Sequence, residues 1–313
     1  MKTFERLKTM KTKFNLVPAL LIMGVLSFSS CNNDETMEDM GEKNVVEVAA
    51  SAGQFTILIE AAQRAGLAEA LSTTENITVF APTDAAFKTL LADLGATSLN
   101  DIPVATLTNI LLYHVIGSKA MSTDLSSGYF PTLSKYGENY ISMYINTNGG
   151  VSINKNTKVT TADISAKNGV IHVVDKVILP PSVVNIALDN DNFTILVQAV
   201  VKAGLVEALS SAGPFTVFAP TNAAFTALFA QLGISGVNDL TAEQLIPILT
   251  YHVISGNVLS SALSNGTVPT LNAGKSLTVN LSGGVKINDS EVVAANIQGS
   301  NGVVHVINKV LLP

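Results

Sequence analysis

Large apolar side chains recur along this chain with two different periods. Between residues 87 and 94, and again between 225 and 232, they stand three or four positions apart, which places them on one face of a helix. We expect both faces to be core, and their members are Phe87, Leu90, Leu91 and Leu94 in the first stretch and Phe225, Leu228, Phe229 and Leu232 in the second.

Other regions alternate apolar and polar positions instead. Residues 144–153 and 277–287 do so around a pair of glycines, which predicts two strands joined by a turn in each region. Residues 170–179 and 303–312 are apolar almost throughout. This predicts closing strands that are buried within a sheet, because a solvated edge would require polar positions.

Glycine, proline and capping residues mark further helices. Residues 56–65 form a helical segment that stops at a glycine, and we expect 45–52 to lead into it, as 183–188 leads into its counterpart. Residues 241–244 read Thr-Ala-Glu-Gln, which is a capping box at the start of a helix. Pro247 then lies inside that helix and is expected to kink it.

The two halves of the chain carry the same pattern. The block Thr78–Phe87 recurs as Thr216–Phe225, 138 residues later, whereas the later equivalents Asn168 and Asn301 are 133 residues apart. The first copy therefore holds five extra residues, which we place between residues 134 and 162. A period of this length indicates two tandem globular domains. We assign them to residues 44–181 and 182–313.

The repeated blocks also carry a family resemblance. Thr78–Phe87 reads T-V-F-A-P-T-D-A-A-F, Tyr113-His114 follows it, and a closing block from Asn168 reads N-G-V-I-H-V-V-D-K-V-I-L-P. In this order the blocks resemble the fasciclin domain, over about residues 45–313. The resemblance implies an α+β fold of two tandem fasciclin-like domains, each a small β-wedge with several packed helices.

In animal members of that family two motifs are implicated in receptor binding, and both are matched here. Tyr113-His114 and Tyr251-His252 match a Tyr-His motif, and Asp163-Ile164 matches an Asp-Ile pair before the last strand. The second copy has Asn296-Ile297 there and lacks the carboxylate. The resemblance therefore implies binding residues at these positions. A structural role is the other interpretation, with Tyr-His at a buried helix-to-strand junction and Asp163 capping a turn.

Patterns typical of catalysis are missing from the sequence. It contains neither a G-x-S-x-G nucleophile motif nor a phosphate-binding glycine-rich loop. The two histidines of each copy are 58 or 53 residues apart, and His172 and His305 sit in runs of Val and Ile, which favours structural roles over a metal or acid–base site. Residues 189–191 lack the Gly and Glu of a calcium loop, so we expect a turn or helix cap. We predict no enzyme activity, no cofactor and no metal.

The charge distribution excludes another class of partner. The net charge is −6, only 13% of residues are charged, and Lys and Arg do not cluster after Lys13. Nucleic-acid binding normally requires a basic patch, so we predict no nucleic-acid partner.

The N-terminus predicts secretion and a lipid anchor. Basic residues, an apolar stretch of eleven residues from 16 to 26 and small residues before Cys31 form a signal peptide over residues 1–30, with Met10 as an alternative start. The apolar stretch is shorter than the ~20 residues that span a bilayer. Cys31 resembles the lipidated cysteine of bacterial lipoproteins, although Phe28 stands where Leu is usual. Residues 31–43 then form an acidic, disordered tether.

Together these features predict a lipid-anchored, non-enzymatic adhesion or binding protein of the cell envelope, held at the outer membrane. Its partners would be extracellular matrix protein, cell-surface protein or glycan. The acidic tether resembles that of surface-exported lipoproteins of some Gram-negative bacteria, which favours exposure at the cell surface. The alternative is a periplasm-facing scaffold that binds carbohydrate or another ligand.

Overall fold

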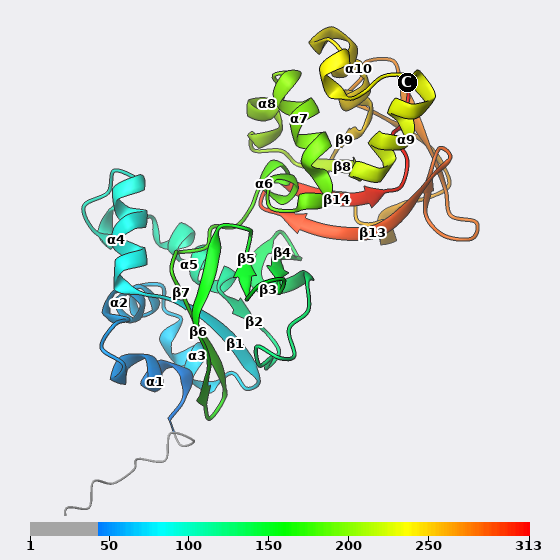
Figure 1. Ribbon diagram of the computed structural model, residues 1–313. Coiled ribbons are helices and arrows are strands. Elements are labelled where there is room, and N and C mark those ends of the chain that lie inside the picture. Colours follow the sequence, from blue (N-terminus) through cyan, green and yellow to red (C-terminus); the bar gives the residue numbers. More distant parts are fainter. Residues whose placement is uncertain (1–42) are drawn as a thin grey trace, which may run out of the picture. The chain divides into compact units, whose positions relative to one another are not determined.

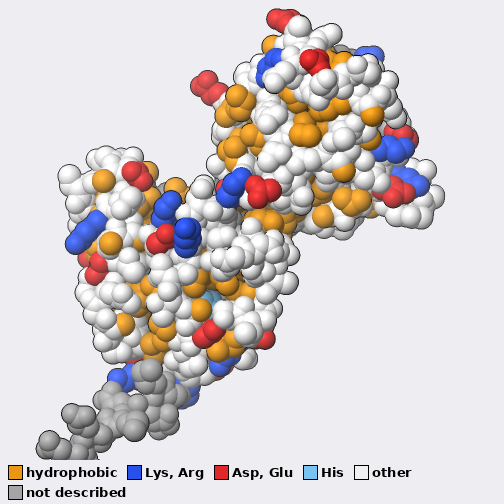
Figure 2. Space-filling view, viewed as in Figure 1, with side chains coloured by type: hydrophobic (Ala, Val, Ile, Leu, Met, Phe, Trp, Pro, Cys, Tyr) orange, Lys and Arg blue, Asp and Glu red, His pale blue; other side chains and the backbone are white. Residues whose placement is uncertain are grey.

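The computed structural model describes residues 43–313. The predicted signal peptide, Cys31 and nearly all of the predicted tether lie outside the described residues. Within the described part of the chain, none of the helices combines the length and hydropathy that a membrane span needs. Charged side chains are sparse on the visible face, and hydrophobic side chains reach the surface on both repeats (Figure 2).

The N-terminal repeat packs its helices on a closed barrel of strands. In Figure 1, helices α1, α2 and α4 lie together on one side of the strands. The helices are α1 (Val45–Ser51), α2 (Thr56–Arg64), α3 (Ala68–Thr73), α4 (Asp84–Asp93), the 3₁₀ turn η1 (Leu99–Asp101) and α5 (Val104–Tyr113). The strands are β1 (Ile77–Pro82), β2 (Val115–Ile116), β3 (Gly128–Tyr136), β4 (Asn139–Asn146), β5 (Ser152–Ile153), β6 (Thr157–Ala166) and β7 (Gly169–Val174).

Strand β1 is central because it joins the first and last parts of the repeat. It pairs in parallel with β7 and antiparallel with β2, and the remaining neighbours pair antiparallel in chain order. The register sets Ile77 opposite Gly169, where a Cβ on the glycine would lie 2.2 Å from the Ile77 carbonyl oxygen. Glycine is therefore required at position 169 by the close approach of the two strands.

The C-terminal repeat has the same order of α-helices and strands, with two additional 3₁₀ turns. Its helices are α6 (Val183–Leu188), η2 (Asp191–Phe193), α7 (Thr194–Lys202), α8 (Val206–Ser210), α9 (Asn222–Leu232), η3 (Val237–Asp239), α10 (Ala242–Tyr251) and η4 (Ser260–Ala262). Its strands are β8 (Phe215–Pro220), β9 (Val253–Ser255), β10 (Gly266–Pro269), β11 (Ser276–Asn280), β12 (Lys286–Ile287), β13 (Ser290–Gly299) and β14 (Gly302–Ile307). The sheet order is β10-β11-β12-β13-β14-β8-β9, with β8 parallel to β14.

The five extra residues of the first copy fall in two turns. Ile145 pairs with Ile153 across two strands, and their counterparts Val279 and Ile287 each lie 134 positions later in the chain. Because the offset is 138 before this point, four of the extra residues lengthen the β3–β4 hairpin. The fifth lies in the turn between β5 and β6, because the offset is 133 from there on. Both turns lie between residues 134 and 162, as the sequence predicts.

The core confirms most of the apolar pattern but corrects one position in each copy. Phe87 and Leu90 are buried, as are their counterparts on α9. Leu94 and Leu232, however, are 54% and 51% exposed, so their assignment to the core was wrong. They stand at the C-terminal ends of α4 and α9, past the turns that carry the buried Phe87 and Phe225, and the neighbouring elements that bury Phe87 are α2, η1 and α5.

Two boundaries also differ from the prediction. Residues 45–52 and 183–188 do not merely lead into a helix; α1 and α6 are helices themselves, capped by Asn44 and Ser182. The closing strands β7 and β14 end at Val174 and Ile307, earlier than expected, because the following residues turn away to meet the histidine at the end of α5 or α10. Helix α10 is continuous through Pro247.

Candidate binding site

Tyr113 ends helix α5 and lies entirely inside the N-terminal repeat. Its side chain is 0% exposed. The hydroxyl donates to the Ser142 carbonyl oxygen at 3.0 Å and accepts from the Asn154 side-chain amide at 2.9 Å. Burial raises the pKa of this phenol well above its usual range. Tyr113 therefore ties α5 to strand β4 and to the turn after β5.

His114 caps the end of the same helix and is also buried. Its Nδ1 lies 2.7 Å from the Ile110 carbonyl oxygen, and its Nε2 accepts the Ile178 N–H at 2.9 Å. This pattern places the proton on Nδ1 of a neutral imidazole. Burial lowers the pKa of His114 to about 4. The ring joins the end of α5 to the segment that follows β7.

The second Tyr-His motif repeats these contacts. The Tyr251 hydroxyl donates to the Ser276 carbonyl oxygen at 3.0 Å and accepts from Asn288 at 3.0 Å. His252 faces the Ile248 carbonyl oxygen at 2.8 Å and accepts the Leu311 N–H at 2.9 Å. Burial lowers the pKa of His252 to about 4 as well. Both Tyr-His pairs are thus junctions inside the fold.

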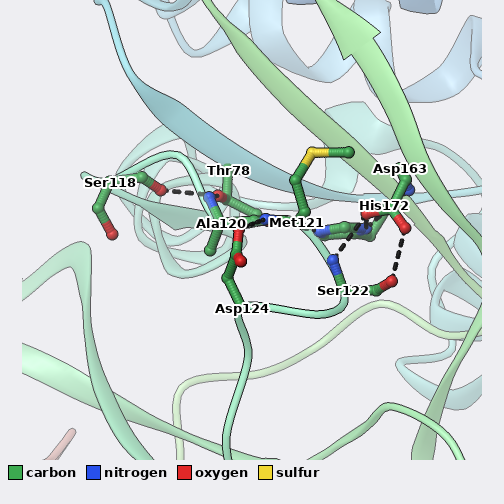
Figure 3. Close-up of polar contacts among 8 residues, drawn as sticks. All are labelled: Thr78, Ser118, Ala120, Met121, Ser122, Asp124, Asp163 and His172. Atoms are coloured by element: carbon green, nitrogen blue, oxygen red, sulfur yellow. Dashed lines mark hydrogen bonds and ion pairs between the residues drawn. The ribbon is translucent and has the colours of Figure 1, made fainter. Parts of the chain in front are cut away.

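Asp163 occupies a different environment, on strand β6 beside the loop that contains Ser122 (Figure 3). It has a φ of +65° within β6, where the pairing with β7 shifts register. One carboxylate oxygen accepts the Ser122 N–H at 2.7 Å and the other accepts the Ser122 hydroxyl at 2.5 Å. These hydrogen bonds hold the pKa of Asp163 below its usual range. The Asp163 side chain as a whole is 32% exposed, so this ionised residue is partly accessible to solvent.

Two buried side chains, His172 and Thr78, contact the backbone of the segment that contains Ser122. His172 on β7 accepts the Asp163 N–H at its Nδ1 (3.1 Å), and its Nε2 lies 3.0 Å from the Ala120 carbonyl oxygen. Thr78 on β1 donates to the Ser118 carbonyl oxygen at 2.7 Å and accepts the Ala120 N–H at 2.9 Å (Figure 3). Residues 118–124, together with Asp163, are called the Asp163 loop below.

The C-terminal repeat builds the same loop without the charge. Asn296 has a φ of +63°, accepts the Ser260 N–H at 2.7 Å and donates to the Ser260 hydroxyl at 2.9 Å. His305 accepts the Asn296 N–H and lies 2.9 Å from the Val258 carbonyl oxygen. An amide therefore replaces the carboxylate with the same partners, and the serine hydroxyl accepts from Asn296 where it donates to Asp163.

The isoleucines of the Asp-Ile motif point into the core. Ile297 is 3% exposed, and Ile164 packs against the core of its own repeat. The hydrogen bonds of Tyr113 and His114 go to β4, α5 and the segment after β7, whereas those of Asp163 go to the loop. Of the candidate residues in the N-terminal repeat, the structure leaves Asp163 with a partly accessible polar side chain.

In every histidine, one ring nitrogen contacts a backbone carbonyl oxygen and the other accepts a backbone N–H. The four residues are His114, His172, His252 and His305. None of these nitrogens is left to bind a metal or to exchange a proton with a substrate. Among residues 43–313, no three His, Cys, Asp or Glu side chains gather as metal ligands would. Asn190 accepts the Asn192 N–H at the start of η2, so the 189–191 segment is a helix cap, as expected.

Sequence reasoning missed two features. The first is the serine that hydrogen-bonds to each candidate side chain: Ser122 binds Asp163, and Ser260 binds Asn296. The two serines are 138 residues apart, the offset of the repeat, so the sequence could have identified them as equivalent. The second feature is an apolar pocket in the C-terminal repeat, between helices α6, α7 and α8. Its lining could have been found by comparing apolar positions between the copies.

Comparisons with known proteins agree with the duplicated architecture. The profile of the Fasciclin domain matches residues 53–180 and 191–313. Protein sll1483 of Synechocystis is 47% identical over 133 residues, which are 42% of this chain and 73% of that protein. The transforming growth factor-beta-induced protein ig-h3 of Sus scrofa is 32% identical over 285 residues, which are 90% of this chain but only 39% of that protein. Among solved structures, the FAS1 domain pair of the insect cell adhesion molecule fasciclin I covers 86% of this chain and 96% of its own, at a TM-score of 0.46 and 17% identity.

Proposed function

Because this chain belongs to the fasciclin domain family over both of its repeats, we propose that it is a non-enzymatic, extracytoplasmic binding protein. Its partner would be a matrix protein, a glycan or a protein on a neighbouring cell. The observation that carries this proposal is the Asp163 loop, where an ionised and partly accessible side chain sits on a segment already fixed by buried hydrogen bonds.

A loop that is ordered before binding is well suited to recognition. Binding a flexible loop costs ordering entropy, whereas the backbone of residues 118–122 is held in advance by Thr78, Asp163 and His172. Each oxygen of the Asp163 carboxylate accepts one hydrogen bond from Ser122. Each oxygen can accept a further hydrogen bond, which leaves acceptor sites for a partner. A guanidinium, ammonium or hydroxyl group of the partner is the chemistry that these sites fit.

The buried histidines support the non-enzymatic part of the proposal. A general acid or base must reach the proton that it transfers. Each imidazole here has its two nitrogens engaged within the fold, and each is at most 2% exposed. In this proposal Tyr113, His114, Tyr251 and His252 position the surrounding elements rather than contact the partner.

The N-terminal sequence supports attachment to the outer membrane through lipid on Cys31. A diacylated and N-acylated cysteine exceeds the two lipid signals that stable anchoring requires. The twelve residues that follow reach at most about 40 Å from the membrane. Labelling cells with radioactive palmitate tests this directly, because Cys31→Ser would remove the label if Cys31 carries it.

The binding proposal is tested by replacing Asp163 with asparagine, the residue at the equivalent position 296 of the C-terminal repeat. Asp163→Asn should keep the loop, since Asn296 makes the equivalent contacts to Ser260. On matrix-protein and glycan arrays, wild-type protein should bind and Asp163→Asn should lose binding, at unchanged thermal stability. Wild-type protein that binds nothing on either array, or full binding by Asp163→Asn, would contradict the proposed contact.

A periplasm-facing ligand-binding scaffold is the second candidate function. The apolar pocket of the C-terminal repeat favours it, because a pocket suits a small ligand better than a neighbouring cell. Protease shaving of intact cells separates the two candidates. Release of the protein supports display at the cell surface, whereas full protection of a protein that is cleaved in lysed cells supports the periplasmic scaffold.

A further inference from the structure

The C-terminal repeat contains an apolar pocket of about 110 Å³. Helices α6, α7 and α8 form its walls, and residues of β8, β9 and α10 close its base. Apart from one histidine, every side chain that lines it is Val, Leu, Ala or Phe. Hydrophobic side chains also reach the surface over α7 and α8 in Figure 2.

The single polar side chain of the lining cannot hydrogen-bond a ligand. His252 faces the Ile248 carbonyl oxygen with one ring nitrogen and accepts the Leu311 N–H with the other. A buried water needs two to four polar partners, and an apolar cavity of roughly 150 Å³ stays dry and takes up benzene. Sugar hydroxyls would lose their hydrogen bonds here, so the pocket selects against carbohydrate.

The other copy serves as an internal comparison. The equivalent space in the N-terminal repeat lies between α1, α2 and α3 and has a volume of only about 40 Å³. Side-chain size does not explain this difference, because Val197 of the larger pocket replaces the longer Ile59 whereas Val200 replaces the smaller Ala62. The duplicated fold therefore does not by itself require the larger pocket.

The rim of the pocket differs even more between the copies. Leu188, Val201 and Val206 line the larger pocket although they are 43%, 59% and 37% exposed. The corresponding residues of the N-terminal repeat are Ala50, Gln63 and Ala68. Solvent-exposed apolar residues grouped around a cavity are typical of ligand-binding sites.

We propose that this pocket binds the end of an unbranched alkyl chain, as found in fatty acids and lipids. The apolar walls would surround the chain end, the apolar rim would cover the next methylenes, and the polar head group would remain in solvent. A peptide is a poorer match, because its backbone N–H and C=O groups need hydrogen-bond partners that this rim lacks. The site lies in the other repeat from the Asp163 loop and does not depend on the proposed adhesion function.

The direct test is a titration of residues 32–313, which lack the predicted signal peptide and the predicted lipid site Cys31, after bound lipid has been removed. Displacement of the fluorescent fatty acid cis-parinaric acid by hexanoate, octanoate and decanoate measures affinity. We expect one saturable site and affinity about fourfold tighter for each added methylene until the pocket is filled, since each buried methylene contributes a constant increment. Decanol should bind within a few fold of decanoate, because the head group is outside.

Matched substitutions locate the site. Val197→Phe fills the larger pocket and should weaken decanoate binding at least tenfold, whereas Ile59→Phe at the equivalent position of the other repeat should leave it unchanged. If Val197→Phe does not fold, cross-linking of wild-type protein with a diazirine fatty acid replaces it, and labelled peptides should come from α6, α7 or α8. Neutral phosphatidylcholine vesicles separate the sources: co-sedimentation that Val197→Phe abolishes indicates membrane lipid, and binding of decanoate alone indicates free fatty acid.

Three results would overturn the proposal. They are no saturable displacement by any of the acids, equal loss of binding in Val197→Phe and Ile59→Phe, and cross-links confined to other elements.

Discussion

Lowering the pH from 7 to 4.5 is expected to destabilise the N-terminal repeat by about 2–3 kcal/mol through His114 alone. In the folded protein the imidazole is buried and neutral, with Nδ1 facing the Ile110 carbonyl oxygen and Nε2 accepting from Ile178. Protonating Nε2 would break the second bond and bury a charge. The unfolded chain exposes the same ring to water, where it takes up a proton freely.

The magnitude follows from the two pKa values of His114. Burial lowers its pKa from an ordinary 6.5 to about 4. Between these values the unfolded state binds more protons than the folded state, so stability falls as the pH falls. The contribution is fully present above pH 6.5 and is lost as the pH approaches 4. At about 1.4 kcal/mol per pH unit, the full interval corresponds to roughly 3 kcal/mol.

Urea unfolding at pH 7.0, 6.0, 5.0 and 4.5 measures this effect. The chain has no Trp, so far-UV circular dichroism is the appropriate signal. The informative variant is His114→Gln, because a Gln side chain can both donate to Ile110 and accept from Ile178 but does not titrate. Its unfolding free energy should fall less steeply with pH than that of the wild type. Assigning a transition to each repeat is necessary, since a two-domain chain need not unfold in a single step.

Other titrating groups are separable from this signal. Asp84 and Asp163 have pKa values held below 3.8 by hydrogen bonds, so their contributions are lost only at lower pH. In the C-terminal repeat, burial raises the pKa of Asp189 to about 7, which opposes the effect of His252 there. The Asp189→Asn background removes that opposition. A wild-type N-terminal transition that is equally stable at pH 7 and 4.5, or an unchanged slope in His114→Gln, would refute the reasoning.

Two further substitutions test the packing of the N-terminal repeat. Gly169→Ala should destabilise it by about 1–3 kcal/mol, because the new methyl would lie 2.2 Å from the Ile77 carbonyl oxygen. The control Gly128→Ala has open space around it and should change thermal unfolding little. Equal effects of the two substitutions would be inconsistent with the close strand approach. Thr78→Val should cost about 1–3 kcal/mol in urea unfolding, because the Ser118 carbonyl and a loop N–H lose their partner, and Thr78→Ser should restore most of it. Full stability of Thr78→Val would show that the loop does not depend on this hydroxyl.

The duplicated architecture could be predicted from the sequence because its signals are local and occur twice. The alternating segments around 149 and 283 became the paired strands β4–β5 and β11–β12. Helix α1 carried a local signal that was overlooked, the capping box between Asn44 and Glu47, whereas the bond from the Val45 N–H to the Asn168 side chain, 123 residues away, could not be predicted from sequence. Leu94 was misplaced because helical spacing defines a face and says nothing of how far along the helix that face remains covered.

The candidate site could be predicted only as a set of motifs. Asp163 and Ile164 are adjacent in β6, and successive strand residues face opposite sides, so the carboxylate reaches the loop while the isoleucine packs into the core. The sequence did not show that the pairing of β6 with β7 shifts register at this point, because such a bulge depends on the partner strand. The burial of both Tyr-His pairs likewise depends on partners far along the chain, such as Ile178 and Leu311.

The most direct test of the proposed function compares cells that display wild-type protein with cells that display Asp163→Asn at equal surface levels. Adhesion to an array of matrix proteins and glycans is the measurement, with cells lacking the protein as the baseline. The proposal predicts adhesion above the baseline for wild type and a return towards the baseline for Asp163→Asn, while Asn296→Asp in the other repeat leaves adhesion intact. Adhesion at the baseline for wild type, or undiminished adhesion for Asp163→Asn, would contradict it.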